Sequence, residues 1–262
     1  MNSEAAEPLA VDRMLKDRRY GVVLTYPRFS PATASRRLSE LKRLGVTHLE
    51  FEGESQVYGV RILGKGCVGL VVIAHARSGR AALKIRRLDA NRSSLRQEAQ
   101  MLKAANEVGV GPRLYGCSRN FLLMELIEGR LFPYWVQALE GKCGRAMLRE
   151  ALTKLLEDCF RLDEAGIDHG ELSRAAKHIM VTPSVNPQIL DFESASCRRR
   201  ASNVTSICQY LLIGSETARA VARLIGDPDR ERLIDALKAY KRKPSLEALR
   251  RVEESAGLTR FK

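Results

Sequence analysis

The sequence has no pair of cysteines at the spacing of a metal site. Its six cysteines lie far apart along the chain, whereas zinc ligands come in pairs separated by roughly two to four residues. The composition is highly charged and poor in aromatic residues, as in thermophiles, where intracellular disulfides occur, but the sequence alone does not pair these thiols. We therefore expect no zinc centre, and we expect most of the cysteines to be small buried side chains.

Long apolar runs are also missing. No stretch approaches the roughly 20 apolar residues that a membrane-spanning helix needs. The start, MNSEAAEPLAVDRMLKDRRYG, lacks the basic end followed by an apolar stretch that is typical of a secretory signal. The sequence thus predicts a cytoplasmic protein with no membrane partner, and no feature indicates an obligate protein partner.

Acidic residues are too few to balance the basic ones. Lys and Arg number 44 against 31 Asp and Glu, which gives a formal net charge of +13 and an isoelectric point near 9.7. The highly charged surface of a thermophile would usually pair its signs. The excess therefore favours an anionic partner such as a nucleic acid.

The first half of the chain is dominated by strand patterns. Residues 58–85 are rich in β-branched residues and glycines, which predicts consecutive antiparallel strands, and residues 113–129 return to strand character. Between them, apolar residues at helical spacing predict one helix, from Leu95 to Ala105. In the first fifty residues, YGVVLTY predicts a strand, SPATASRRLSELKRLG a capped helix and THLEFEG a second strand.

The second half is dominated by helix patterns. The leucine spacing between Arg145 and Ala165 predicts a long amphipathic helix, and the chain beyond Arg200 is mostly helical. Strands with one helix, followed by a helix-rich remainder, predict an α+β protein in two lobes. The expected division is an extension over residues 1–51, a strand-rich lobe over 52–128 and a helical lobe over 129–262.

A glycine-rich segment, LGKGCVGLVV, lies among the predicted strands. Gly64, Gly66 and Gly69, followed by Val71, match the loop that closes over ATP phosphates between two antiparallel strands. Side chains at these positions would block the approach of backbone N–H groups to phosphate. A dinucleotide-binding turn uses the same glycine spacing, but it needs a helix directly afterwards, and LVVIAHA is typical of a strand.

The next strand and helix supply a lysine and a glutamate. Lys84 in AALKIRR is in the setting of a phosphate-binding lysine, and Glu98 in RQEAQML is placed to hold it. Each could instead be a solvent-exposed charge. The order of glycines, lysine and glutamate favours the nucleotide site.

The segment FLLMELIEG fits a link between the two lobes. Backbone groups from Glu125 to Ile127 would meet an adenine edge there. An ordinary buried strand ending in a turn fits the same residues.

Two further segments, HGELSRAAKHIMV and QILDFESAS, complete the pattern. Asp191 follows an apolar strand, as an aspartate that binds nucleotide-bound magnesium does. With these motifs, residues from about 52 to 213 resemble the protein-kinase superfamily, and are most similar to the atypical RIO-type kinases and the small KEOPS-complex kinase. Within that group the two segments resemble an archaeal family of RNA kinases that phosphorylate a ribose 2′-hydroxyl in tRNA.

The sequence departs from the superfamily at three positions. Glu171 replaces the catalytic aspartate, and Ala176 stands where a metal-binding asparagine is expected. A loop lengthened by two residues would put His178 in the asparagine's role, as a magnesium ligand, a phosphate ligand or a group that orients Asp191; an ordinary loop histidine is equally compatible. Glu193 replaces the glycine after Asp-Phe, which removes a flexible hinge.

The resemblance implies a kinase-like bilobal fold that binds ATP and Mg2+ in the cleft between the lobes. It gives catalytic roles to Glu171, Lys84 and His169, and a metal-binding role to Asp191. The favoured acceptor is a tRNA 2′-hydroxyl, because of the family, the basic excess and the missing platform for a peptide substrate. The alternatives are a RIO-like serine/threonine protein kinase and an RNA-binding pseudokinase, the latter favoured by Glu171 and the lost asparagine.

Basic residues gather in two segments of the predicted helical lobe, SCRRRASN and LKAYKRKPS. In a protein that binds folded RNA, such clusters contact phosphates. A solvated face that serves solubility alone is the other interpretation. The candidate RNA-binding residues are Arg198, Arg199, Arg200, Lys241, Arg242 and Lys243.

Overall fold

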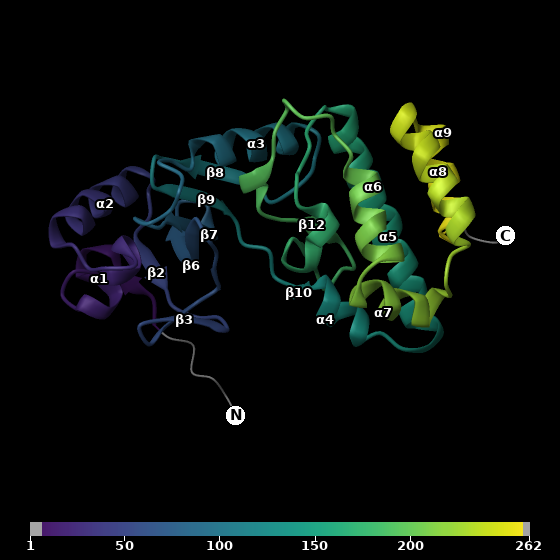
Figure 1. Ribbon diagram of the computed structural model, residues 1–262. Coiled ribbons are helices and arrows are strands. Elements are labelled where there is room, and N and C mark those ends of the chain that lie inside the picture. Colours follow the sequence, from purple (N-terminus) through teal and green to yellow (C-terminus); the bar gives the residue numbers. More distant parts are fainter. Residues whose placement is uncertain (1–6, 259–262) are drawn as a thin grey trace. The chain divides into compact units, whose positions relative to one another are not determined.

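The computed structural model describes residues 7–258 (Figure 1), and the chain forms two compact units. The first contains the residues up to Gln100 together with Arg113–Leu126, and the second contains Met101–Pro112 together with the residues from Ile127. The mixture of an antiparallel sheet with many helices confirms the predicted α+β class. No helix within the described residues combines the length and the apolar character needed to cross a membrane.

A seven-stranded antiparallel sheet is the centre of the first unit. Its strands run in the order β1-β2-β6-β7-β9-β8, with β5 paired to β6. They are β1 (Leu9–Ala10), β2 (His48–Glu50), β5 (Gly64–Lys65), β6 (Gly69–Ala76), β7 (Gly79–Arg86), β8 (Leu114–Cys117) and β9 (Phe121–Glu125). A separate hairpin joins β3 (Ser55–Val57) to β4 (Val60–Ile62). The predicted antiparallel strands over residues 58–85 are therefore confirmed.

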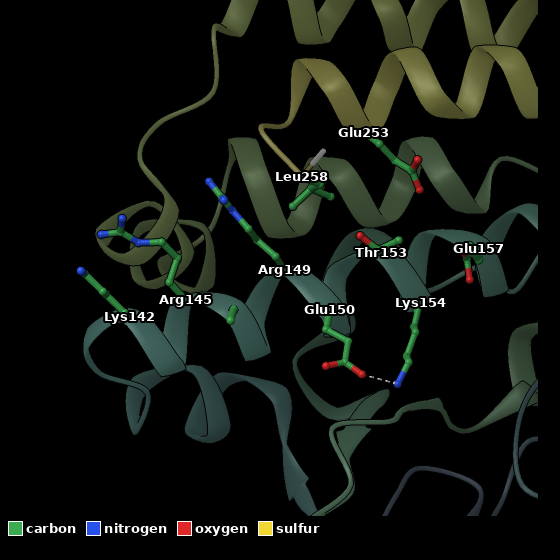
Figure 2. Close-up of a pocket in the computed structure, with 10 residues that line it drawn as sticks. Lys142, Arg145, Arg149, Glu150, Thr153, Lys154, Glu157, Glu253 and Leu258 are labelled. Carbon is green, nitrogen blue, oxygen red and sulfur yellow. Dashed lines mark hydrogen bonds and ion pairs between the residues drawn. The ribbon is translucent and has the colours of Figure 1, made fainter. Parts of the chain in front are cut away.

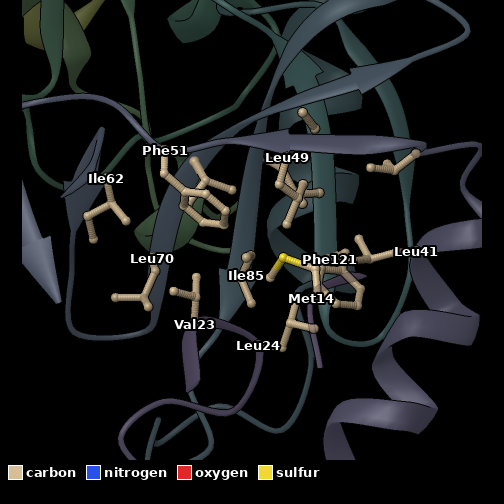
Figure 3. Packing of buried hydrophobic residues seen from close by; sticks show 14 of the residues in the cluster. Met14, Val23, Leu24, Leu41, Leu49, Phe51, Ile62, Leu70, Ile85 and Phe121 are labelled. Carbon is tan, nitrogen blue, oxygen red and sulfur yellow. The ribbon is translucent and has the colours of Figure 1, made fainter. Parts of the chain in front are cut away.

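Residues 7–50 belong to this unit rather than forming a separate domain. Strands β1 and β2 join the sheet beside β6, and η1 (Val11–Arg13), α1 (Arg18–Thr25) and α2 (Pro31–Arg43) accompany them. Figure 3 shows Met14, Leu24 and Leu41 pointing toward Phe121 of β9, and all four are fully buried. The extension thus completes the apolar core of the sheet.

A buried arginine also ties the extension to the sheet. Arg37 of α2 is 2% exposed and donates to the carbonyl oxygens of Leu24 and Arg86, the latter at 2.7 Å, and to Oδ1 of Asn120 at 3.0 Å. Burial lowers the pKa of its guanidinium to about 10. Three oxygen acceptors compensate the charge, as a buried cation requires.

The predicted strand over residues 20–26 is wrong, because this segment lies in helix α1. The Asp17 side chain caps the helix by accepting from the Arg19 N–H at 2.8 Å. Val23 and Leu24, both fully buried, pack into the core from it. The preference of valine for strands is weaker than the packing that the core offers to a short amphipathic helix. The predicted helix over residues 30–45 and the following strand are confirmed as α2 and β2.

Helix α5 (Gly141–Glu164) is the longest element of the second unit and packs against α6, α7 and α9. The five apolar residues that predicted it are all buried: Leu148, Leu152, Leu155, Cys159 and Leu162. The other helices are α3 (Arg96–Glu107), within which the two units divide, α4 (Phe132–Gln137), α6 (Asn203–Cys208), α7 (Glu216–Ile225), α8 (Arg230–Arg242) and α9 (Leu246–Ser255), with η4 (Gln209–Ile213) following α6.

A small three-stranded sheet carries the loops of interest in the second unit. It consists of β10 (Arg130–Leu131), β11 (Ile179–Val181) and β12 (Pro187–Ile189), in that order. Two short helical turns, η2 (Leu172–Lys177) and η3 (Phe192–Ser194), lie directly before β11 and after β12. Because β11 and β12 are paired antiparallel, the loop before the first and the loop after the second meet at one end of this sheet.

The expectation that most cysteines are buried is wrong. Cys159 and Cys208 are buried, whereas the other four are exposed, and all six are free thiols. Burial raises the pKa of the Cys208 thiol to about 12. The exposed cysteines are not among the regularly spaced apolar residues that form the buried faces of helices and strands.

Candidate functional site

The glycine-rich loop crosses from β5 to β6 in the first unit. Gly64 pairs with Val71, and the N–H of Gly66 donates to the carbonyl oxygen of Gly69 at 2.8 Å. A Cβ at Gly69 would lie 2.9 Å from Cγ of Lys84, so packing alone excludes a side chain there. At Gly64 a Cβ would meet nothing within 4 Å, and at Gly66 only an ordinary contact at 3.6 Å. The fold does not itself demand glycine at positions 64 and 66, which leaves room for a ligand beside the backbone.

Lys84 and Glu98 form a buried ion pair beneath this loop. Lys84 lies on β7 opposite Val71, and Glu98 lies in the first turn of α3. The Lys84 Nζ is 2.8 Å from Glu98 Oε1, and the two residues are 5% and 4% exposed. Burying such a pair costs several kcal/mol of desolvation per ion, which good geometry roughly offsets. The pair therefore adds little net stability to the fold, and its main effect is to fix the position of the Lys84 ammonium.

The residues predicted to meet an adenine edge divide between the two units. Glu125 ends β9, and its N–H is already donated to the Arg113 carbonyl oxygen at 2.8 Å. Its carboxylate also accepts from the Arg113 N–H, at 3.1 Å. Ile127 belongs to the second unit. The Glu125 N–H is thus engaged within the sheet, and the adenine contact stays a prediction.

Glu171 lies at the centre of a small polar cluster in the second unit. It immediately precedes η2, and its Oε2 is 3.0 Å from Nε2 of His178. Its Oε1 accepts from the hydroxyl of Ser194 in η3. Ser194 was not singled out from the sequence, because a serine three residues after an aspartate carries no recognisable signal.

His178 has its two ring nitrogens in different surroundings. Nε2 faces Glu171, while Nδ1 is buried and has no hydrogen-bond partner among the described residues. A metal ion at Nε2 would have to displace Glu171, whereas Nδ1 is enclosed by the surrounding protein. The contact with Glu171 thus fits a residue that orients the carboxylate better than it fits the predicted metal ligand.

His169 is fully buried in the same loop. Its Nε2 is 3.1 Å from the carbonyl oxygen of Leu190, and its ring lies 5.1 Å from that of Phe192, centroid to centroid. Burial lowers the pKa of the imidazole to about 4. A neutral, buried ring joining the two loops supports a positioning role; its predicted part in catalysis stays a prediction.

The buried His169 should make stability depend on pH. A folded pKa of about 4 lies below the ordinary 6.5, so below pH 6.5 the unfolded chain binds a proton that the folded chain does not. The free energy of unfolding is therefore not reduced by this group above pH 6.5. It falls as the pH is lowered from 6.5 toward 4, by about 3 kcal/mol in all. Urea unfolding at several pH values should show a shallower pH dependence for His169→Gln than for the wild type. If the two proteins show the same pH dependence of unfolding free energy, the pKa of His169 does not differ between the folded and unfolded chain.

Asp191 and Glu193 form an acidic pair at the end of β12. A carboxylate oxygen of each lies within 4.8 Å of one of the other. Asp191 has a left-handed backbone, with φ of 66°, which is uncommon outside glycine and is tolerated best by Asp and Asn. Two carboxylates at this separation fit the oxygen ligands that Mg2+ prefers.

Arg199 holds the start of the loop. Its Nε is 2.7 Å from Oδ2 of Asp168, and its Nη2 donates to the Ser194 carbonyl oxygen at 2.6 Å. Gly170, with φ of 86°, lies so close that a Cβ there would be 2.6 Å from the Arg199 guanidinium. Arg199 thus holds the loop in place, and its predicted role in RNA binding stays a prediction.

A buried polar network that the sequence does not reveal anchors the same loop. Oδ1 of Asp163 on α5 accepts from the Asn203 backbone N–H at 2.7 Å and from its side chain at 2.8 Å, while Oδ2 accepts from the Tyr240 hydroxyl at 2.9 Å. The Asn203 amide in turn donates to the Ile167 carbonyl oxygen and accepts from the His169 N–H, at 2.7 and 2.9 Å. Burial raises the pKa of the Asp163 carboxyl above its usual value. Helices α5, α6 and α8 thereby fix the backbone around Glu171.

The two basic segments come together in the second unit. Arg200 donates through Nη2 to the carbonyl oxygen of Lys241 and, at 3.4 Å, to that of Arg242. Arg198, Lys241, Arg242 and Lys243 are exposed. Lys241, Arg242 and Lys243 offer positive charge at the end of α8, and Arg198 adds another charge two residues before Arg200.

A groove of about 730 Å³ runs along α5 (Figure 2), and its lining includes none of the residues predicted from the sequence. Its cations are nearly matched by carboxylates, and Lys154 pairs with Glu150 at 2.8 Å. The residues lining it are Lys142, Arg145, Ala146, Arg149, Glu150, Thr153, Lys154, Glu157, Glu253 and Leu258. With its charges nearly balanced, the groove offers little net attraction to a polyanion.

No protein-family model matches the chain, and no curated protein sequence matches it.

Proposed function

We propose that this protein is an ATP-dependent RNA kinase with a protein-kinase-like fold, which transfers the γ-phosphate of ATP to a ribose 2′-hydroxyl of a tRNA nucleotide, with uridine as the favoured nucleotide. The observation that carries the phosphotransferase part is the buried pair of Lys84 and Glu98 under the glycine-rich loop. The RNA acceptor rests on the family resemblance and on the net charge of +13.

In this proposal the candidate residues each have a chemical role. The backbone at Gly64 and Gly66 and the ammonium of Lys84 bind the ATP phosphates. Asp191 and Glu193 would hold Mg2+, and a bound Mg2+ would neutralise charge on the phosphates. Glu171 orients the 2′-hydroxyl and accepts its proton while the 2′ oxygen attacks the γ-phosphorus, and the bond from that phosphorus to the β–γ bridging oxygen breaks to release ADP.

Two features of the site also fit the alternative functions, a protein kinase and a pseudokinase. The residues of the proposed site act on the phosphates and on a hydroxyl, so a RIO-like serine/threonine protein kinase would use the same set. Both carboxylate oxygens of Glu171 are engaged, by Ser194 and His178, and a carboxylate that only holds its loop in place would fit an RNA-binding pseudokinase.

One experiment separates these functions. The purified protein is incubated with γ-labelled ATP and Mg2+, either with bulk archaeal tRNA or alone, and modified tRNA is mapped by mass spectrometry. We expect label in tRNA as an alkali-resistant 2′-phosphate. Label in the protein alone would favour the protein kinase, and no transfer at all would favour the pseudokinase.

The charge at the end of α8 should bind RNA phosphates. Changing Arg198 and Lys241 together to alanine leaves the loop-bracing Arg199 intact, and we expect it to raise the KM for tRNA and leave the KM for ATP unchanged. The dependence of affinity on salt should flatten by roughly 0.9 in log–log slope for each phosphate that the variant no longer neutralises. The matched control is Arg230→Ala with Arg232→Ala, which removes the same charge from the exposed beginning of α8. If both double variants bind tRNA equally weakly, the effect is one of net charge and not of a binding site.

A further inference from the structure

The hairpin before the glycine-rich loop carries an aromatic residue in a conformation that disfavours one. Tyr58 and Gly59 form the turn between β3 and β4, with φ of 49° and 79°. Two-residue turns of this kind usually carry Asn, Asp or Gly first, because a larger side chain is strained at positive φ. A bulky residue at such a position is the sort of backbone outlier from which a functional role is reasonably inferred.

The Tyr58 ring is exposed and yet held in place. The residue is 61% exposed, and its hydroxyl donates to the carbonyl oxygen of Pro27 at 2.8 Å. A ring already fixed at its far end loses little conformational entropy when a second ring stacks on it. Exposure combined with fixation is what a stacking surface needs.

Cations surround a second tyrosine beside it. The Tyr26 and Tyr58 ring centroids are 6.1 Å apart, and the Tyr26 centroid lies 4.8 Å from Nζ of Lys65 and 4.9 Å from Cζ of Arg87. Arg87 is paired with Asp89 at 2.7 Å, so Lys65 supplies the net positive charge of the cluster.

This cluster is continuous with the loop proposed to cover ATP. Lys65 lies between Gly64 and Gly66, and Nη1 of Arg87 donates to the Gly66 carbonyl oxygen at 2.9 Å. A nucleotide bound at Tyr58 would therefore be held next to the loop over the phosphates.

We propose that Tyr58, with the neighbouring Tyr26 and Lys65, is a stacking site for an unpaired base of the RNA acceptor. Single-stranded RNA is recognised mainly by stacking of splayed bases on aromatic side chains, with cations on the adjacent phosphates. The site rests on the proposed RNA acceptor and specifies it further: the acceptor nucleotide lies in, or next to, an unpaired segment.

The test compares two tyrosines of the first unit. Binding of a fluorescent oligouridylate, without ATP, is measured by anisotropy for the wild type, Tyr58→Asn, Tyr58→Phe and the control Tyr115→Ala, whose ring is also exposed, on β8. Asn suits the left-handed backbone, so Tyr58→Asn should unfold within a few degrees of the wild type. Loss of one stacked base should raise its Kd roughly ten-fold or more, while Tyr115→Ala stays near the wild-type Kd. Tyr58→Phe keeps the stacking face but loses the hydrogen bond to Pro27, so its Kd should lie between those of the wild type and Tyr58→Asn.

The outcomes separate this site from the proposed function. An unchanged Kd in Tyr58→Asn, an equal rise of Kd in Tyr115→Ala, or no binding of oligouridylate to the wild type would overturn the stacking site. Transfer of label to tRNA by Tyr58→Asn with the wild-type KM would also overturn it, while leaving the RNA kinase assignment standing. Absence of transfer by the wild type would count against the RNA kinase, and the oligouridylate measurement would still decide on Tyr58.

Discussion

Replacing Lys84 by methionine together with Glu98→Gln is expected to lower the rate of phosphoryl transfer by roughly 10²- to 10³-fold or more. A preorganised cation in a water-excluded site stabilises charge that shifts during transfer, and losing one such group typically has an effect of that size. The two residues form a buried pair at 2.8 Å, so Lys84→Met alone would strip Glu98 of this partner, at about 3–5 kcal/mol of stability. The double variant removes both charges and separates the loss of activity from unfolding.

Turnover with labelled ATP and thermal unfolding are the two measurements. The control is Lys103→Met, at an exposed position of the same helix as Glu98, and it should keep wild-type turnover. A double variant that folds and turns over within two-fold of the wild type would remove Lys84 from the site.

Glu171→Gln is expected to reduce kcat by roughly 10²-fold or more with the KM for ATP unchanged. The amide keeps the shape of the side chain and can still meet Ser194 and His178, but it cannot accept the proton of the attacking hydroxyl. Because Glu171 is partly exposed, with 41% of its side chain accessible, the substitution should leave the unfolding temperature nearly unchanged.

Two further variants sharpen this result. Glu164→Gln, at an exposed position near the end of α5, is the matched control and should behave as the wild type. Ser194→Ala removes the hydroxyl that donates to Glu171, so we expect a smaller loss of kcat than in Glu171→Gln. A wild-type kcat in Glu171→Gln would place the base elsewhere, with Asp168 as the next candidate, although its carboxylate is already paired with Arg199 at 2.7 Å.

Regular spacing explains which parts of the fold were predictable. The apolar spacing in α5 and the β-branched run through β6 and β7 predicted these elements because their packing repeats along the chain. The segment in α1 was predicted as a strand and is a helix, because its valines pack into a core formed partly by residues distant in sequence. The exposure of four cysteines could not be predicted from the sequence either, because these residues are not part of a periodic apolar pattern.

The sequence by itself determined the α+β class, the order of the candidate residues and the basic excess, because these depend on composition and on spacing along the chain. Only the tertiary structure decided which side chains meet: Lys84 with Glu98, Glu171 with Ser194 and His178, and Asp163 with Asn203 and Tyr240. It also decided that Arg199 braces a loop while Tyr58 stands exposed in a strained turn. Such pairings join residues up to 77 positions apart, and they depend on how strands and helices pack in three dimensions, for which no short segment carries a signal.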